Sequence, residues 1–178
     1  ASALMLSTSL GACAQLSGLM PGRTDATPPP PAAAAPFEYV RDIHSHARPE
    51  IARVVHVDLN LNADFDAKVL SGTATLDVTA EPGATELILD ARNLDIRSIK
   101  DGQGRALHFM MGENDPILGQ AVRVHFPAFA AGERRRFVVD YATRPDAAAL
   151  QWLNPSQTAG GQKPYLFSQG QAILTRTW

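Results

Sequence analysis

Short alternating segments separated by turn residues constrain the fold of this chain more than any other feature. Between Val55 and Leu61 apolar residues alternate with polar ones, which is the pattern of a half-buried antiparallel strand. Residues 72–81 alternate in the same way, and more short strands are expected at 85–90, 94–100, 105–110, 121–126, 133–143 and 165–173. Gly, Pro, Asn and Asp separate these segments, and none has the period of an amphipathic helix. The sequence therefore predicts an all-β domain, in which antiparallel strands form a β-sandwich or a saddle-shaped structure.

The first residues have the character of a secretion signal followed by a spacer. Residues 3–12 are apolar or small, as in a signal peptide, and are too few to span a membrane. Leu10-Gly11-Ala12-Cys13 matches the bacterial lipobox, whose cysteine thiol receives a diacylglycerol. Residues 14–36 are rich in Pro and Ala and favour an extended spacer. A free cysteine in a disordered tail is the alternative reading of Cys13.

These features predict three segments. We expect a truncated lipoprotein signal peptide over 1–13, a disordered linker and lead-in over 14–49, and the β-domain over 50–178. The expected location is the bacterial cell envelope, with the lipid anchor holding the protein at the membrane. Ala14 and Gln15 lack the aspartate that marks retention at the inner membrane, which favours the periplasmic side of the outer membrane.

Charge and motifs exclude several functions. The net charge is −2, so the chain lacks the basic surface that nucleic-acid binding needs. It contains neither a nucleophile elbow nor a phosphate-binding glycine loop, and no His-Glu-x-x-His zinc motif. His44 and His46 could ligate zinc from an extended segment, but no third ligand follows at a familiar spacing, and a polar turn with local hydrogen bonds is the favoured reading. The run 134–136 of three arginines is expected to face solvent on a strand rather than to bind an anion.

Two glutamines near the end of the chain require partners. On a strand over 165–173, Gln169 and Gln171 would share one face, with Gly170 between them. Buried primary amides either form hydrogen bonds or reduce stability. The two amides could bond to each other and to nearby backbone, or they could offer carbonyl acceptors to a ligand ammonium, with Gly170 permitting close approach of the backbone.

Four blocks of sequence carry a wider pattern: DIHSHARPE (42–50), VVHVDLNLNADFDAKVLSGTATLDV (54–78), LQWLNPSQTAGGQKPYLFSQGQAI (150–173) and TRTW (175–178). The third block is the most specific, because Gln-Trp-Leu, Pro-x-Gln-Thr, Pro-Tyr-Leu-Phe-Ser-Gln and Gln-Ala follow one another in order. Together the blocks resemble the amino-terminal region of the leukotriene hydrolase/aminopeptidase branch of the gluzincin zinc aminopeptidases. The resemblance covers roughly residues 40–178.

This resemblance implies a function for the glutamines. In the family the matching strand reaches a cleft shared with a thermolysin-like catalytic domain, which carries the zinc. Gln171 matches a residue that helps to hold the free α-amine of a peptide substrate, and Gln169 matches a neighbour lining the same cleft. Gly170 stands where the family commonly has cysteine, which implies a wider cleft wall. The implied partners are peptides with a free amino terminus and a catalytic domain downstream in the same polypeptide.

The expected function is therefore that of the substrate-positioning domain of a zinc metalloaminopeptidase. Because the chain begins with alanine and stops at Trp178, we expect a fragment that has no catalytic residues or zinc of its own and is inactive alone. A lipid-anchored β-sandwich that binds ligands without catalysis is the first alternative. A parent enzyme that also opens epoxides is the second.

Overall fold

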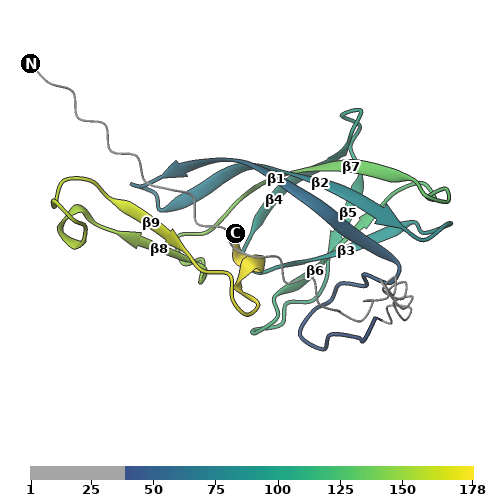
Figure 1. Cartoon of the computed structure of the whole chain (residues 1–178), viewed down its shortest axis with the longest axis horizontal. Coiled ribbons are helices and arrows are strands. Elements are labelled where there is room, and N and C mark those ends of the chain that lie inside the picture. Colours follow the sequence, from purple (N-terminus) through teal and green to yellow (C-terminus); the bar gives the residue numbers. More distant parts are fainter. Residues whose placement is uncertain (1–38) are drawn as a thin grey trace, which may run out of the picture. The chain divides into compact units, whose positions relative to one another are not determined.

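The computed structural model describes residues 39–178, and these form nine β-strands and two short 3₁₀-helices (Figure 1). The lipobox cysteine Cys13 and the Pro/Ala-rich linker lie outside the described residues. The strands are β1 (Ala52–Asp64), β2 (Val69–Ala80), β3 (Glu86–Ala91), β4 (Asp95–Asp101), β5 (His108–Met111), β6 (Gln120–His125), β7 (Arg134–Ala142), β8 (Leu150–Leu153) and β9 (Tyr165–Ser168). The 3₁₀-helices are η1 (Pro155–Gln157) and η2 (Leu174–Thr177).

All strand pairs are antiparallel, which confirms the all-β prediction. One sheet has the order β1-β2-β7-β4 and the other has the order β3-β6-β5. Strands β8 and β9 form a separate hairpin, which extends away from the two larger sheets (Figure 1). Within residues 39–178 no helix has the length and apolar character needed to cross a bilayer.

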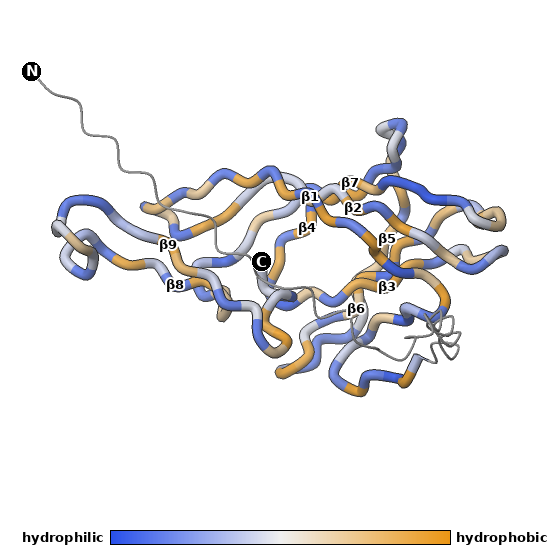
Figure 2. Tube along the Cα trace, in the orientation of Figure 1, coloured by the Kyte–Doolittle hydropathy of each residue, from blue (hydrophilic) through white to orange (hydrophobic). Residues whose placement is uncertain are grey.

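The main core lies between the two larger sheets. Hydrophobic and hydrophilic residues are interleaved along the strands (Figure 2), and the strands of the two larger sheets contribute apolar side chains to the core between them. The most deeply buried of these side chains come from five strands: Val78, Leu87, Ile99, Val122, Val124 and Phe137. A second, smaller cluster packs Leu70, Ala147 and Leu150 beneath the β8–β9 hairpin. The hairpin is therefore attached to the sandwich by apolar contacts of its own.

The predicted strand over 55–61 is present as part of β1, but its apolar side is not covered as expected. Val55, Val57 and Leu59 are 44%, 50% and 44% exposed. Because β1 is the outermost strand of its sheet, no neighbouring strand shields it on that side. Val57 and Leu59 face an open cavity instead of a packed core.

Two expectations for the last third of the chain were wrong. The strands expected from the sequence do not include β8, which is only four residues long and pairs Leu150 with Ser168. It also predicted a strand from 165 to 173, whereas β9 ends at Ser168 and residues 171–173 form a turn. The partner strand β8 begins at Leu150, so beyond Ser168 there is no strand for the chain to pair with.

Candidate functional site

The turn between β9 and η2 carries the three residues that the sequence analysis selected. Gln169 is joined to the preceding hairpin by its backbone N–H, which donates to the Ala149 carbonyl at 2.9 Å. The Gly170 carbonyl then accepts from the N–H groups of Leu174 and Thr175, at 2.9 and 3.3 Å. These bonds close the chain into a turn that leads directly into η2. The glutamines therefore lie on a turn and not on one face of a strand.

Gln169 and Gln171 are both exposed, and their amides have different environments. The Gln169 Oε1 accepts a hydrogen bond of 3.1 Å from the Gln171 backbone N–H. Within residues 39–178 the side-chain amide of Gln171 has no hydrogen-bond partner. One amide thus orders the turn, while the other is available for a ligand.

Gly170 is needed for close packing inside the turn. A Cβ atom at this position would lie 2.7 Å from Thr175 Oγ1. The Thr175 hydroxyl also donates to the Gly170 carbonyl at 3.3 Å. The space left by the missing side chain is therefore filled by Thr175.

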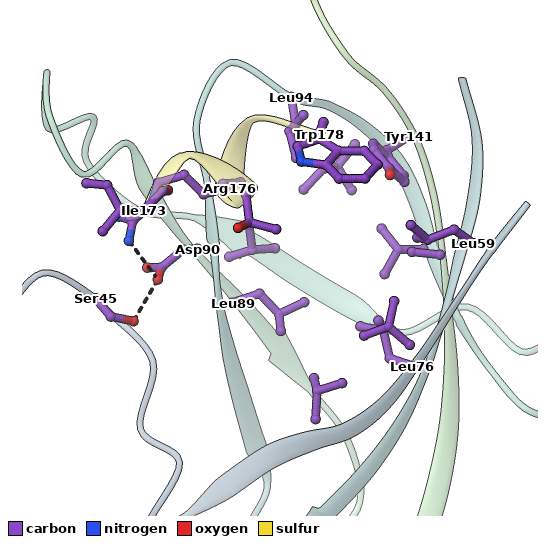
Figure 3. Close-up of a pocket in the computed structure, with 18 of the residues that line it drawn as sticks. Ser45, Leu59, Leu76, Leu89, Asp90, Leu94, Tyr141, Ile173, Arg176 and Trp178 are labelled. Carbon is purple, nitrogen blue, oxygen red and sulfur yellow. Dashed lines mark hydrogen bonds and ion pairs between the residues drawn. The ribbon is translucent and has the colours of Figure 1, made fainter. Parts of the chain in front are cut away.

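An apolar cavity of about 510 Å³ adjoins the turn (Figure 3). Strands β1, β2, β4 and β7 line one side with residues such as Leu59, Leu76 and Tyr141, while Leu89 of β3 lines the other. Burial raises the pKa of the Tyr141 hydroxyl, so this group is neutral at physiological pH. Trp178 lies at the edge of the cavity, and its indole Nε1 is buried without a hydrogen-bond partner in the described part of the chain.

The described residues do not offer a zinc site. No group of three or more His, Cys, Asp or Glu side chains comes together within residues 39–178. His44 bonds locally: its N–H donates to Asp42 Oδ1 at 2.8 Å, and its Nδ1 lies 3.3 Å from the same oxygen. The hydrogen bond from the His44 N–H is the main cause that lowers the pKa of the Asp42 carboxyl. The local bonds of His44 fit the polar-turn reading, whereas the His46 N–H donates to the distant Asp90 of β3 at 2.8 Å.

The three consecutive arginines are each paired with a carboxylate. Arg134 and Arg136 lie on one side of β7 and donate to Asp77 of β2, at 3.0 and 2.9 Å. Arg135 donates to Glu133 at 2.6 Å and also binds two backbone carbonyls of the preceding loop. Arg134 and Arg136 share one carboxylate and remain half-exposed, while Arg135 is held by its own carboxylate and by the loop.

Arg176 is a buried cation that the sequence did not predict. Arg176 of η2 is only 6% exposed at its side chain, and it forms an ion pair of 3.4 Å with Asp90 of β3. An arginine within an otherwise uncharged end segment, ILTRTW, was the available signal. The sequence could not show that Asp90, more than eighty positions earlier, lies beside it.

Comparisons with known proteins place this fold among zinc peptidases. The chain is 33% identical to leukotriene A-4 hydrolase of Xenopus laevis over 138 residues, which are 76% of this chain and 22% of the relative. It is 38% identical to leucine aminopeptidase 2 of Yarrowia lipolytica over 117 residues, which are 66% of this chain and 18% of the relative. A solved structure of yeast leukotriene A-4 hydrolase in complex with bestatin superposes with a TM-score of 0.70 and 29% identity, covering 82% of this chain and 22% of that one. No protein-family model matches the sequence.

The resemblance found in the sequence is thereby confirmed, and the class of protein is that of the zinc metallopeptidases. More narrowly, the chain belongs to the leukotriene A-4 hydrolase and leucine aminopeptidase branch of the gluzincin aminopeptidases and corresponds to the amino-terminal domain of its relatives. These relatives are hydrolases. The chain spans 18% and 22% of the length of the two curated relatives named above.

Proposed function

We propose that this protein acts as the substrate-positioning domain of a zinc metalloaminopeptidase, which removes amino-terminal residues from peptides. The names of the relatives, leucine aminopeptidase and leukotriene A-4 hydrolase, support this function. In this proposal a catalytic domain in the same polypeptide supplies the zinc, because the described residues contain no group that fits the ion. Residues 39–178 contribute recognition of the substrate and no bond-breaking step.

The exposed amide of Gln171 is the observation that carries this proposal. Its carbonyl oxygen accepts hydrogen bonds and is neutral, so it can bind the α-ammonium of a peptide without adding charge to the site. The turn between β9 and η2 presents this amide at the surface, with no competing partner in the described residues. An exopeptidase must fix the distance from the amine to the scissile carbonyl, and an amine-binding acceptor provides that fixed point.

Replacement of Gln171 in the full-length enzyme tests the assignment. Loss of one acceptor for a charged amine costs on the order of 1.5–3 kcal/mol. We therefore expect Gln171→Leu to lower kcat/KM on an aminoacyl-arylamide by about tenfold or more. Gln162→Leu is the matched control, since Gln162 is an exposed glutamine in the loop before β9. Kinetics of Gln171→Leu that equal those of the control would contradict the assignment.

We also propose that Cys13 carries a lipid that anchors the protein in the bacterial cell envelope, on the periplasmic side of the outer membrane. The lipobox sequence and the Pro/Ala-rich spacer after it support this location. An acyl chain contributes about 0.8 kcal/mol per buried methylene, so the two chains of a diacylglycerol hold a protein firmly. Radiolabelled palmitate should enter the full-length protein in bacteria and not its Cys13→Ser variant. Equal labelling of both proteins would exclude the anchor.

A further inference from the structure

Arg176 is a buried cation close to the proposed amine-binding turn. It belongs to η2, and its side chain is 6% exposed. A buried charge is costly unless it is paired and hydrogen-bonded, so the partners of this guanidinium show what it holds in place.

The guanidinium binds groups from four separate segments of the chain. Its Nε donates to the Ile173 carbonyl at 2.9 Å, its Nη1 to the Leu118 carbonyl at 2.7 Å, and its Nη2 to the His44 carbonyl at 2.7 Å. Nη2 also lies 3.4 Å from Asp90 Oδ2. The planar fork of an arginine provides donors in these several directions at once, which a lysine ammonium on its flexible chain does not reproduce.

The carboxylate that faces Arg176 is itself held by the segment before β1. Ser45 Oγ donates to Asp90 Oδ2 at 2.6 Å, and the His46 N–H donates to Asp90 Oδ1 at 2.8 Å. Figure 3 shows the two interactions of Asp90: the hydrogen bond from Ser45 and the ion pair with Arg176. The Arg176 carbonyl in turn accepts from the Arg92 N–H at 2.8 Å. Arg176 therefore fixes η2 to β3 through its side chain and to the residue after β3 through its backbone.

One of these bonds reaches the turn that presents Gln171. Ile173 is two residues after Gln171, and its carbonyl is bound by Arg176. The turn is otherwise held by the bonds of Gln169 and by the Leu174 and Thr175 N–H groups, which donate to the Gly170 carbonyl. The Arg176–Ile173 bond connects the second end of the segment, through the other donors of the guanidinium, to the sandwich.

We propose that Arg176 is a positioning residue for amine recognition: it holds the turn so that the Gln171 amide meets the α-ammonium of the substrate. This inference rests on the proposed function of Gln171. Arg176 is buried beneath the turn and does not contact the substrate. Its effect comes through the orientation of an acceptor, to which enzyme kinetics are highly sensitive.

A pair of inhibitors separates positioning from general stability. One inhibitor is a zinc-binding aminopeptidase inhibitor with a free α-amine, and the other is its analogue without the amine. The ratio of their Kd values for the full-length zinc enzyme measures amine recognition alone, because loss of zinc or partial unfolding weakens both inhibitors together. Calorimetry gives both values without reference to turnover.

Arg176→Lys is the test variant, and we expect it to lower the preference for the amine by about fivefold or more. Arg135→Lys is the matched control. Arg135 also binds backbone carbonyls and a carboxylate, but it holds the loop before β7, so its replacement should leave the preference unchanged. If Arg176→Lys does not fold, Asp90→Asn removes the charge that faces Arg176 and should lower the same preference.

A double-mutant cycle with Gln171→Leu gives the decisive comparison. If Arg176 acts through Gln171, Arg176→Lys has little further effect on the ratio once Gln171 is leucine. The positioning role would be overturned if Arg176→Lys changed the ratio of the two Kd values equally with glutamine and with leucine at position 171. It would also be overturned if the ratio were unchanged in the folded Arg176→Lys or Asp90→Asn variant. An unchanged ratio in Gln171→Leu alone would instead overturn the proposed function of the turn, and with it this inference.

Discussion

Gln169 and Gln171 have chemically identical side chains, but their amides have different roles in the turn. The Gln169 carbonyl is occupied by the Gln171 backbone N–H, so this amide stabilises the turn. The Gln171 amide has no partner within the described residues and is free to meet a ligand. On a strand the two amides would lie side by side, because alternation places residues i and i+2 on the same face. The turn removes that equivalence.

Gly170 provides a prediction at the same scale. In Gly170→Ala the new Cβ would lie 2.7 Å from Thr175 Oγ1, so the hydroxyl must rotate away or the turn must shift. We expect this overpacking to lower the free energy of unfolding by on the order of 1 kcal/mol. Chemical denaturation of the protein measures the change. Adding Thr175→Ala should restore much of the loss because it removes the clashing atom, and a double variant no more stable than Gly170→Ala would contradict this explanation.

Among the elements, β2 and β7 are joined by a charged pair as well as by backbone hydrogen bonds. Asp77 lies directly opposite Arg136 in the register of the two strands. The hydrogen bond from Arg136 is the largest cause that lowers the pKa of Asp77 below its ordinary value of 3.8. Asp77 is 13% exposed at its side chain, while Arg134 and Arg136 are 53% and 60% exposed. Solvent therefore screens the pair in part.

This pair predicts a pH dependence of stability with a definite sign. Because the pKa of Asp77 is lower in the folded than in the unfolded protein, its contribution is fully present above pH 3.8 and is lost as the pH falls from there through the folded pKa. Other carboxylates, such as Asp101 and Glu133, also have lowered pKa values, so wild type and Asp77→Asn must be compared. In thermal unfolding experiments, the Tm of Asp77→Asn should fall less between neutral and acid pH than the Tm of the wild type. Parallel curves for the two proteins would refute the prediction.

The elements that sequence reasoning predicted best are those with long alternating patterns. Strands β1, β2 and β7 have nine or more residues each, and each was expected close to its observed place. Strand β8 was missed because four residues, LQWL, are too few to establish a period. The end of β9 was misplaced because the ending depends on where the partner strand stops, which the local sequence does not contain.

The folded unit leaves an apolar surface open along β1. The two larger sheets enclose a core, yet β1 exposes Val55, Val57 and Leu59, of which Val57 and Leu59 line the 510 Å³ cavity. Alternation in the sequence identified these as apolar positions of a strand. Only the strand order shows that β1 is an edge, and thus that these side chains face an open space rather than a packed interior.

The sequence by itself determined the all-β class, most of the strands and the family, because alternation and the ordered motifs between residues 150 and 173 are local properties of the chain. It also drew attention to Gln171. The tertiary structure decided that Gln171 lies on a turn and that Thr175 fills the space beside Gly170. It also revealed that Arg176 meets Asp90 and carbonyls from distant segments. Contacts of this kind depend on how separate segments are brought together, which a one-dimensional pattern does not specify.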